Sequence, residues 1–162
     1  MTEPERIRGQ IAKAFTAGPW YGPSLLEVLA GVDAKTAAAH PISGAHSIWE
    51  VLLHVRYGQQ LMINRVRGSQ AKWDLSADWP GVREPSGTAW QAMLEDLKRG
   101  EEELCQAVAA FPEDRLDEPV LPDAPSMYDN LQGYAQHHAY HAGQITMLKK
   151  AVMQPGPADH AR

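Results

Sequence analysis

Three histidines stand close together toward the C-terminal end of the sequence: His137, His138 and His141. If this segment is helical, residues four apart share a face, so His137 and His141 direct their imidazoles at one point. Histidine pairs at this spacing recur in helical metal sites for that geometric reason. Metal sites that also bind water or a substrate commonly take three ligands from the protein. The pair therefore predicts a metal site that needs a third ligand from elsewhere in the chain.

The third ligand that we predict is His54, which lies well inside another expected helix in a row of otherwise apolar residues. Gly58 follows one turn later and leaves space beside the imidazole for an ion and its water. A polar group in a helical core is costly unless it finds a partner, and a metal ion is one such partner. Two alternatives stay open: His54 is a hydrogen-bonded core residue, or His138 replaces His137 as a ligand, because it lies three residues from His141.

Two further residues are candidates for catalysis beside such a site. Glu50 lies one turn before His54 and is a candidate general acid or base. Alternatively, it completes a capping box with Ser47 at the start of the helix. Gln144 lies three residues after His141 and could hydrogen-bond a ligand or orient an imidazole. An ion held by three neutral imidazoles would acidify a bound water or activate a thiolate, which are two different chemistries from one site.

The elements that must position these residues are helices, because helical periodicity dominates and no convincing alternating strand is found. An N-terminal helix over about residues 4–17 is followed by short helical pieces. Three long helices are predicted over about residues 46–66, 86–110 and 127–153. Three long helices and a broken N-terminal one predict an all-α four-helix bundle. We predict one domain over residues 1–153 and a flexible C-terminal tail over residues 154–162.

A connection over residues 68–87 is longer than a usual turn in a bundle and predicts a crossover or a functional flap. It carries Trp73 and Trp79, which either cover the mouth of the metal site or seal the edge of the core. Cys105 is interpreted as a buried small hydrophobic residue rather than a nucleophile.

Composition narrows the class of protein. The 162 residues suit one domain, and 44% hydrophobic with 22% charged residues is ordinary globular usage. The net charge of −5, with no dense cluster of lysine and arginine, argues against a nucleic-acid partner.

The expected location is the cytoplasm. The single cysteine, Cys105, rules out a disulfide within the chain, which fits a reducing compartment. The N-terminus lacks the apolar core of a signal peptide, and no apolar run approaches the length needed to span a membrane. We therefore predict a soluble protein with no membrane partner.

Two segments carry a family resemblance. The segment His46-Ser-Ile-Trp-Glu-Val-Leu-Leu-His54-Val and the segment His137-His-Ala-Tyr-His141-Ala-Gly-Gln144-Ile resemble the DinB/YfiT-like family of metalloenzymes, the DinB superfamily. The run Gly18-Pro-Trp-Tyr-Gly-Pro-Ser-Leu-Leu is similar to the N-terminal part of the same family. The resemblance extends from about residue 7 to residue 150, and the last histidine block is its most specific part.

The resemblance implies a four-helix bundle in up-down-down-up order, with a long crossover between helices 2 and 3. The family's three metal-binding histidines fall on His54, His137 and His141. It implies one divalent metal ion, zinc or nickel, with open positions occupied by water. Some relatives transfer low-molecular-weight thiols or isomerise substrates with a thiol cofactor, and many have no known substrate.

The function that we predict is that of a metal-dependent enzyme acting on a small molecule. Hydrolysis follows from a metal-bound water, whereas thiol S-transfer, with a low-molecular-weight thiol as partner, follows only from the resemblance. The alternative is a metal-binding or small-ligand-binding helical bundle without catalytic turnover. A homodimer is a further expectation.

Overall fold

The regular secondary structure is helical in the part of the chain that the computed structural model describes, residues 1–153. The helices are α1 (Glu3–Phe15), α2 (Leu25–Leu29), α3 (Ala34–Ala38), α4 (Ile48–Val66), α5 (Gly87–Ala109), the 3₁₀ turn η1 (Glu113–Arg115) and α6 (Met127–Met153). One isolated bridge joins Pro119 and Ser126. The predicted all-α class is confirmed, and the predicted long helices correspond to α4, α5 and α6.

The starts of the helices are set by side-chain caps that the sequence makes visible. At α4, the Ser47 hydroxyl accepts a hydrogen bond from the Glu50 amide, and the Glu50 carboxylate accepts one from the Ser47 amide at 2.7 Å. This capping box satisfies two amides that have no partner within the helix. It fixes where α4, the helix that carries His54, begins.

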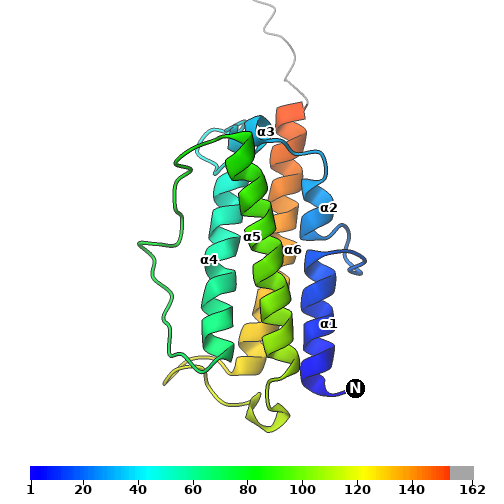
Figure 1. Ribbon diagram of the computed structural model, residues 1–162, viewed down its shortest axis with the longest axis vertical. Helices are drawn as coiled ribbons and strands as arrows, with labels where there is room; N and C mark the ends of the chain where they lie inside the picture. Colours follow the sequence, from blue (N-terminus) through cyan, green and yellow to red (C-terminus); the bar gives the residue numbers. More distant parts are fainter. Residues whose placement is uncertain (154–162) are drawn as a thin grey trace, which may run out of the picture.

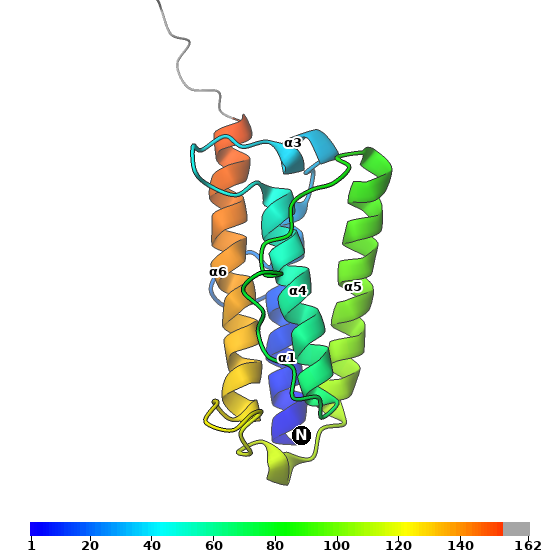
Figure 2. The ribbon, with the colours of Figure 1, turned by 90° about the vertical axis from the view of Figure 1, so that its left-hand side faces the viewer.

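Four helices, α1, α4, α5 and α6, lie side by side along the long axis of the molecule, and α3 crosses one end (Figures 1 and 2). In Figure 1, α1 and α6 run upward and α4 and α5 run downward. The connection between α4 and α5, residues 67–86, forms no helix. It returns along the outside of the bundle and passes in front of α4 in Figure 2, so it lies over the helix that carries His54.

The core consists of two hydrophobic clusters with polar residues between them. One cluster contains Val55 on α4, Leu97 on α5 and Ala142 on α6. The other cluster contains residues farther along α4 and α5 and earlier on α6: Met62, Leu104 and Tyr134. The buried polar residues of these three helices, all of which except His54 fall between the clusters along the helices, are His54, Gln59, Glu101, His138 and His141. We call this set the polar layer.

The inner part of the polar layer is a hydrogen-bond network that joins α4, α5 and α6. The Gln59 amide donates to the Leu97 carbonyl at 3.0 Å and to Glu101 Oε2 at 2.9 Å. The Tyr134 hydroxyl donates to the same Glu101 oxygen at 2.8 Å. His138 Nδ1 donates to the Tyr134 carbonyl at 3.1 Å, and its Nε2 lies 3.7 Å from Glu101. The alternative in which His138 is a metal ligand therefore finds no support, because its ring faces α5.

The tail predicted over residues 154–162 lies outside the described residues. The single domain over residues 1–153 stays a prediction. Within that range, none of the helices is long and apolar enough to cross a membrane.

The close packing of α5 on the polar layer gives a test of this arrangement. A Cβ atom added at Gly100 would lie 2.2 Å from Gln59 Oε1, and Gln59 is fully buried and held by two hydrogen bonds. Overpacking a core typically costs about 1–3 kcal/mol. We expect Gly100→Ala to lower the free energy of unfolding by about that amount, measured by urea denaturation.

The matched control is Gly133→Ala on α6, where an added Cβ would meet nothing within 4 Å. Alanine has the higher helix propensity, so this variant should gain roughly 0.5–1 kcal/mol. Equal effects of the two substitutions would contradict the close contact between α5 and Gln59.

Candidate metal centre

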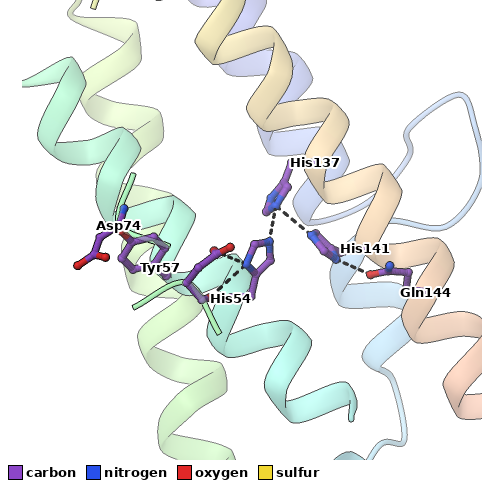
Figure 3. Close-up of polar contacts among 7 residues, drawn as sticks. His54, Tyr57, Asp74, His137, His141 and Gln144 are labelled. Atoms are coloured by element: carbon purple, nitrogen blue, oxygen red, sulfur yellow. Dashed lines mark hydrogen bonds and ion pairs between the residues drawn. The ribbon is translucent and has the colours of Figure 1, made fainter. Parts of the chain in front are cut away.

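Three imidazoles from two helices, two of them members of the polar layer, converge on one point (Figure 3). His137 Nε2 lies 2.9 Å from His54 Nε2 and 2.9 Å from His141 Nε2. The three potential ligand atoms all lie within 4.8 Å of one another. His54 is 7% exposed and His141 is 2% exposed, whereas His137 is half-buried, so the group is shielded from water except on the side of His137. The structure thus brings together the three histidines that the sequence predicted as metal ligands.

The outer nitrogens of two of these rings have hydrogen-bond acceptors. His54 Nδ1 lies 2.7 Å from Asp78 Oδ1 and 3.2 Å from the Asp78 carbonyl oxygen. His141 Nδ1 lies 2.7 Å from Gln144 Oε1. Carboxylate and carbonyl oxygens only accept, so both Nδ1 atoms carry the proton and donate it. In the neutral rings the lone pairs are then on Nε2, which is the atom that points into the group.

Burial keeps two of the rings neutral. Removal from water, followed by the neighbouring His141 and His54, lowers the pKa of His137 to about 3. Removal from water also lowers the pKa of His141 to about 4, against the opposing effect of the Gln144 hydrogen bond. Neutral imidazole is the form that binds a metal ion, so no proton has to be displaced from either ring at neutral pH.

The donor set fits a divalent ion. His54 and His141 present lone pairs, and His137 has at most one Nε2 proton to share between them. A cation at the common point would satisfy all three nitrogens at once. Tetrahedral zinc, with Zn–N of about 2.0–2.1 Å, sets nitrogens roughly 3.3 Å apart, so the two 2.9 Å separations would widen by only a few tenths of an ångström. Imidazole nitrogen suits both zinc and nickel.

The crossover over residues 67–86 covers one face of the group with aromatic rings. Trp79 stacks on His54 with ring centroids 4.1 Å apart, and His46 stacks on the other face of Trp79 at 3.9 Å. Trp73 lies tilted against His54 at 5.8 Å. Of the two roles predicted for these tryptophans, the structure favours the one in which they cover the histidines.

Two hydrogen bonds hold the crossover against α4. The Asp74 amide donates to the Tyr57 hydroxyl at 2.7 Å (Figure 3), and Asp78 accepts the proton of His54 Nδ1. Asp78 is 9% exposed, so this bond is shielded from water. The position of the loop and the orientation of one imidazole therefore depend on each other.

The two residues predicted as catalytic have different surroundings. Gln144 contacts His141 directly and orients its ring, one of the two roles considered for it. The polar contacts of Glu50 are with Ser47, with His40 at 3.0 Å and with His46 at 3.6 Å. They correspond to the capping-box alternative and not to a contact with the histidine group.

Asp78 is the residue that sequence reasoning missed. It lies 24 positions after His54 on an irregular segment, so no helical or strand spacing connects the two. The available signal was general: a metal-binding histidine almost always donates its other ring nitrogen to a carboxylate, carbonyl or water. That rule directs attention to carboxylates in the crossover, without distinguishing Asp78 from Asp74.

A comparison with known proteins identifies the family of this chain. A protein-family model described as the DinB superfamily matches residues 23–145, which is more than half of the chain. The matched range includes the three histidines together with Asp78 and Gln144. No curated protein and no solved structure matches the chain. The family resemblance predicted from the two histidine segments is confirmed.

The Asp78–His54 hydrogen bond makes a prediction about metal affinity. Loss of a carboxylate partner from a metal-binding histidine typically costs about 10–100-fold in affinity. We expect Asp78→Ala to weaken zinc binding by that factor, measured by competition with a chromophoric chelator. Asp78→Asn keeps an acceptor oxygen, so this variant should lose less zinc affinity than Asp78→Ala. An unchanged affinity in Asp78→Ala would contradict the orienting role of this residue.

Proposed function

The chain belongs to the DinB superfamily, and from this premise we propose that it is a metal-dependent enzyme acting on a small molecule. In the proposal, His54, His137 and His141 hold one divalent ion. The observation that carries it is the convergence of three Nε2 atoms, two of them on rings whose Nδ1 protons are already engaged. Three protein ligands leave a position for water or substrate, whereas a structural zinc site usually closes with four.

We also propose that the helices form the up-down-down-up four-helix bundle of the family. The opposed directions of α1 and α6 against α4 and α5 in Figure 1 support this order. In it, two parallel helices in succession require a long return segment, and residues 67–86 supply one that also reaches the histidine group.

A divalent ion at this position would acidify a bound water or stabilise a thiolate. The surrounding residues have separate tasks. Asp78 and Gln144 hold two rings in one tautomer and one orientation. Trp79 covers the face of His54 and excludes water from it. His137 is the ring through which the group meets a neighbouring cavity, so we propose that a substrate approaches from that side.

Hydrolysis and thiol S-transfer are both compatible with this arrangement, and zinc and nickel are both compatible with the ligands. Hydrolysis needs only the ion and a water. Thiol transfer needs a second substrate, a low-molecular-weight thiol, and rests on the family alone. The remaining possibility is a binding protein that has the same metal site but catalyses no reaction.

Metal content tests the proposal. We expect about one zinc or nickel ion per chain in the tag-free protein by plasma mass spectrometry, and less than a tenth of that in His54→Ala and in His141→Ala. His40→Ala is the matched control, because His40 is exposed and contacts Glu50 rather than the histidine group. Circular dichroism establishes that each variant is folded.

A folded wild-type protein that holds no metal and takes up neither added zinc nor added nickel would contradict the proposal. With the metal bound, hydrolase and thiol-transferase substrate panels separate an enzyme from a binding protein. Turnover that disappears in His54→Ala and persists in His40→Ala is the expected result.

A further inference from the structure

A cavity of about 350 Å³ lies between α4 and α6 and ends at the histidine group. Residues of α4, of α6 and of the two neighbouring loops form its walls, among them Arg65, Trp73, Asn130 and His137. His137 lines one end, and Asn130 lies seven residues earlier on the same helix, about 10 Å away at 1.5 Å per residue. Arg65 is at the Asn130 end, because the two side chains are hydrogen-bonded.

The Arg65 guanidinium is partly buried without an anionic partner. Its Nε donates to the Ala71 carbonyl at 3.0 Å, and its Nη1 donates to Asn130 Oδ1 at 2.8 Å. Both acceptors are neutral, and within residues 1–153 no carboxylate lies within ion-pair distance of Arg65. Burial lowers the pKa of Arg65, as expected for a cation that lacks a compensating charge. Among the described residues, the remaining N–H groups of the guanidinium have no hydrogen-bond acceptor, so they can donate to an anion.

Between this end and the histidines, the cavity is mostly apolar. Leu61 and Met62 on α4, Trp73 on the crossover and Tyr134 on α6 all contribute to its lining. Gly133 lies on the α6 wall, where an added Cβ would meet nothing within 4 Å, so the absence of a side chain leaves the cavity wide. A pocket with apolar walls and a few placed polar groups is typical of a small-molecule site.

We infer that the substrate of this protein is a small amphipathic carboxylate, about 10 Å long, whose carboxylate binds Arg65 and Asn130 while its apolar body lies along Trp73. The far end of such a molecule reaches His137, and this part of the inference rests on the proposed function. Guanidinium binds carboxylate through paired hydrogen bonds. Asp129 also lines the cavity, with its carboxylate hydrogen-bonded to Ser126. Its negative charge favours a ligand with one charge over a phosphate or a dicarboxylate.

The test uses metal-free protein, so that carboxylate binding is measured independently of the metal. The probes are 4-phenylbutyrate and its neutral analogue 4-phenylbutyramide, in isothermal titration calorimetry. We expect the carboxylate to bind about tenfold to a hundredfold more tightly than the amide, the range for hydrogen bonds to a charged group. Arg65→Gln should abolish this preference, and Arg6→Gln, a substitution of an exposed arginine on α1, should retain it.

A second pair of variants leaves Arg65 intact. Gly133→Leu fills the cavity and should weaken phenylbutyrate binding at least tenfold, while its thermal stability stays equal or rises, because leucine is the better helix former. Gly143→Leu is the matched control on the same helix, since Gly143 does not line this cavity and has the same open surroundings.

Equal binding of carboxylate and amide would overturn the inference, as would unchanged binding in both Arg65→Gln and Gly133→Leu. A protein that binds metal but shows either result would keep the proposed function and lose the inferred substrate class. A protein that binds the carboxylate but no metal would lose the proposed function instead.

Discussion

Polar side chains in the middle of a helical core must find partners there, and this requirement organises the structure. The two hydrophobic clusters on either side supply the burial that holds the helices together. Between them, Gln59 and Tyr134 both donate to Glu101, and His138 donates to the Tyr134 carbonyl, which joins three helices. Among the described residues, Gln59 Oε1, Glu101 Oε1 and His138 Nε2 are left without a hydrogen-bond partner. The remaining imidazoles, those of His54, His137 and His141, direct three nitrogens at one another. His137 Nε2 carries at most one proton, which is too few for a hydrogen bond to each of the other two nitrogens. One divalent ion, in contrast, can bind all three nitrogens at once.

The crossover both contacts the histidines and covers one side of them. Asp78 accepts the outer proton of His54, and Trp79 stacks on the same ring, so the segment that returns from α4 to α5 also completes the surroundings of the histidines. On the other side of the group, a cavity begins beside His137 and is lined by Trp73 and by apolar residues of α4. One side of the group is therefore held by the crossover, and the other side opens into this cavity.

Much of this arrangement follows from local patterns in the sequence. The Ser47–Glu50 capping box sets the start of α4, and the spacing of His137 and His141 on α6 requires the two rings to share a face. We expected His54 to lie close to that pair because all three residues sit at similar depths inside their helices. The structure brings the three rings together. The contacts of Asp78 and the partners of Glu101 could not be predicted, because they join an irregular loop or a third helix to residues far away in the chain. Such contacts depend on how the helices pack against one another, and the periodicity of hydrophobic residues in the sequence does not predict that packing.

Zinc K-edge X-ray absorption of the zinc-loaded protein tests the central claim most directly, because it counts the imidazoles bound to the ion. The account predicts three imidazole nitrogens at about 2.0–2.1 Å together with one further light atom, and two imidazoles in the weakly binding His54→Ala variant after loading with excess zinc. A spectrum that His54→Ala leaves unchanged, or one with a sulfur atom among the nearest neighbours, would contradict it.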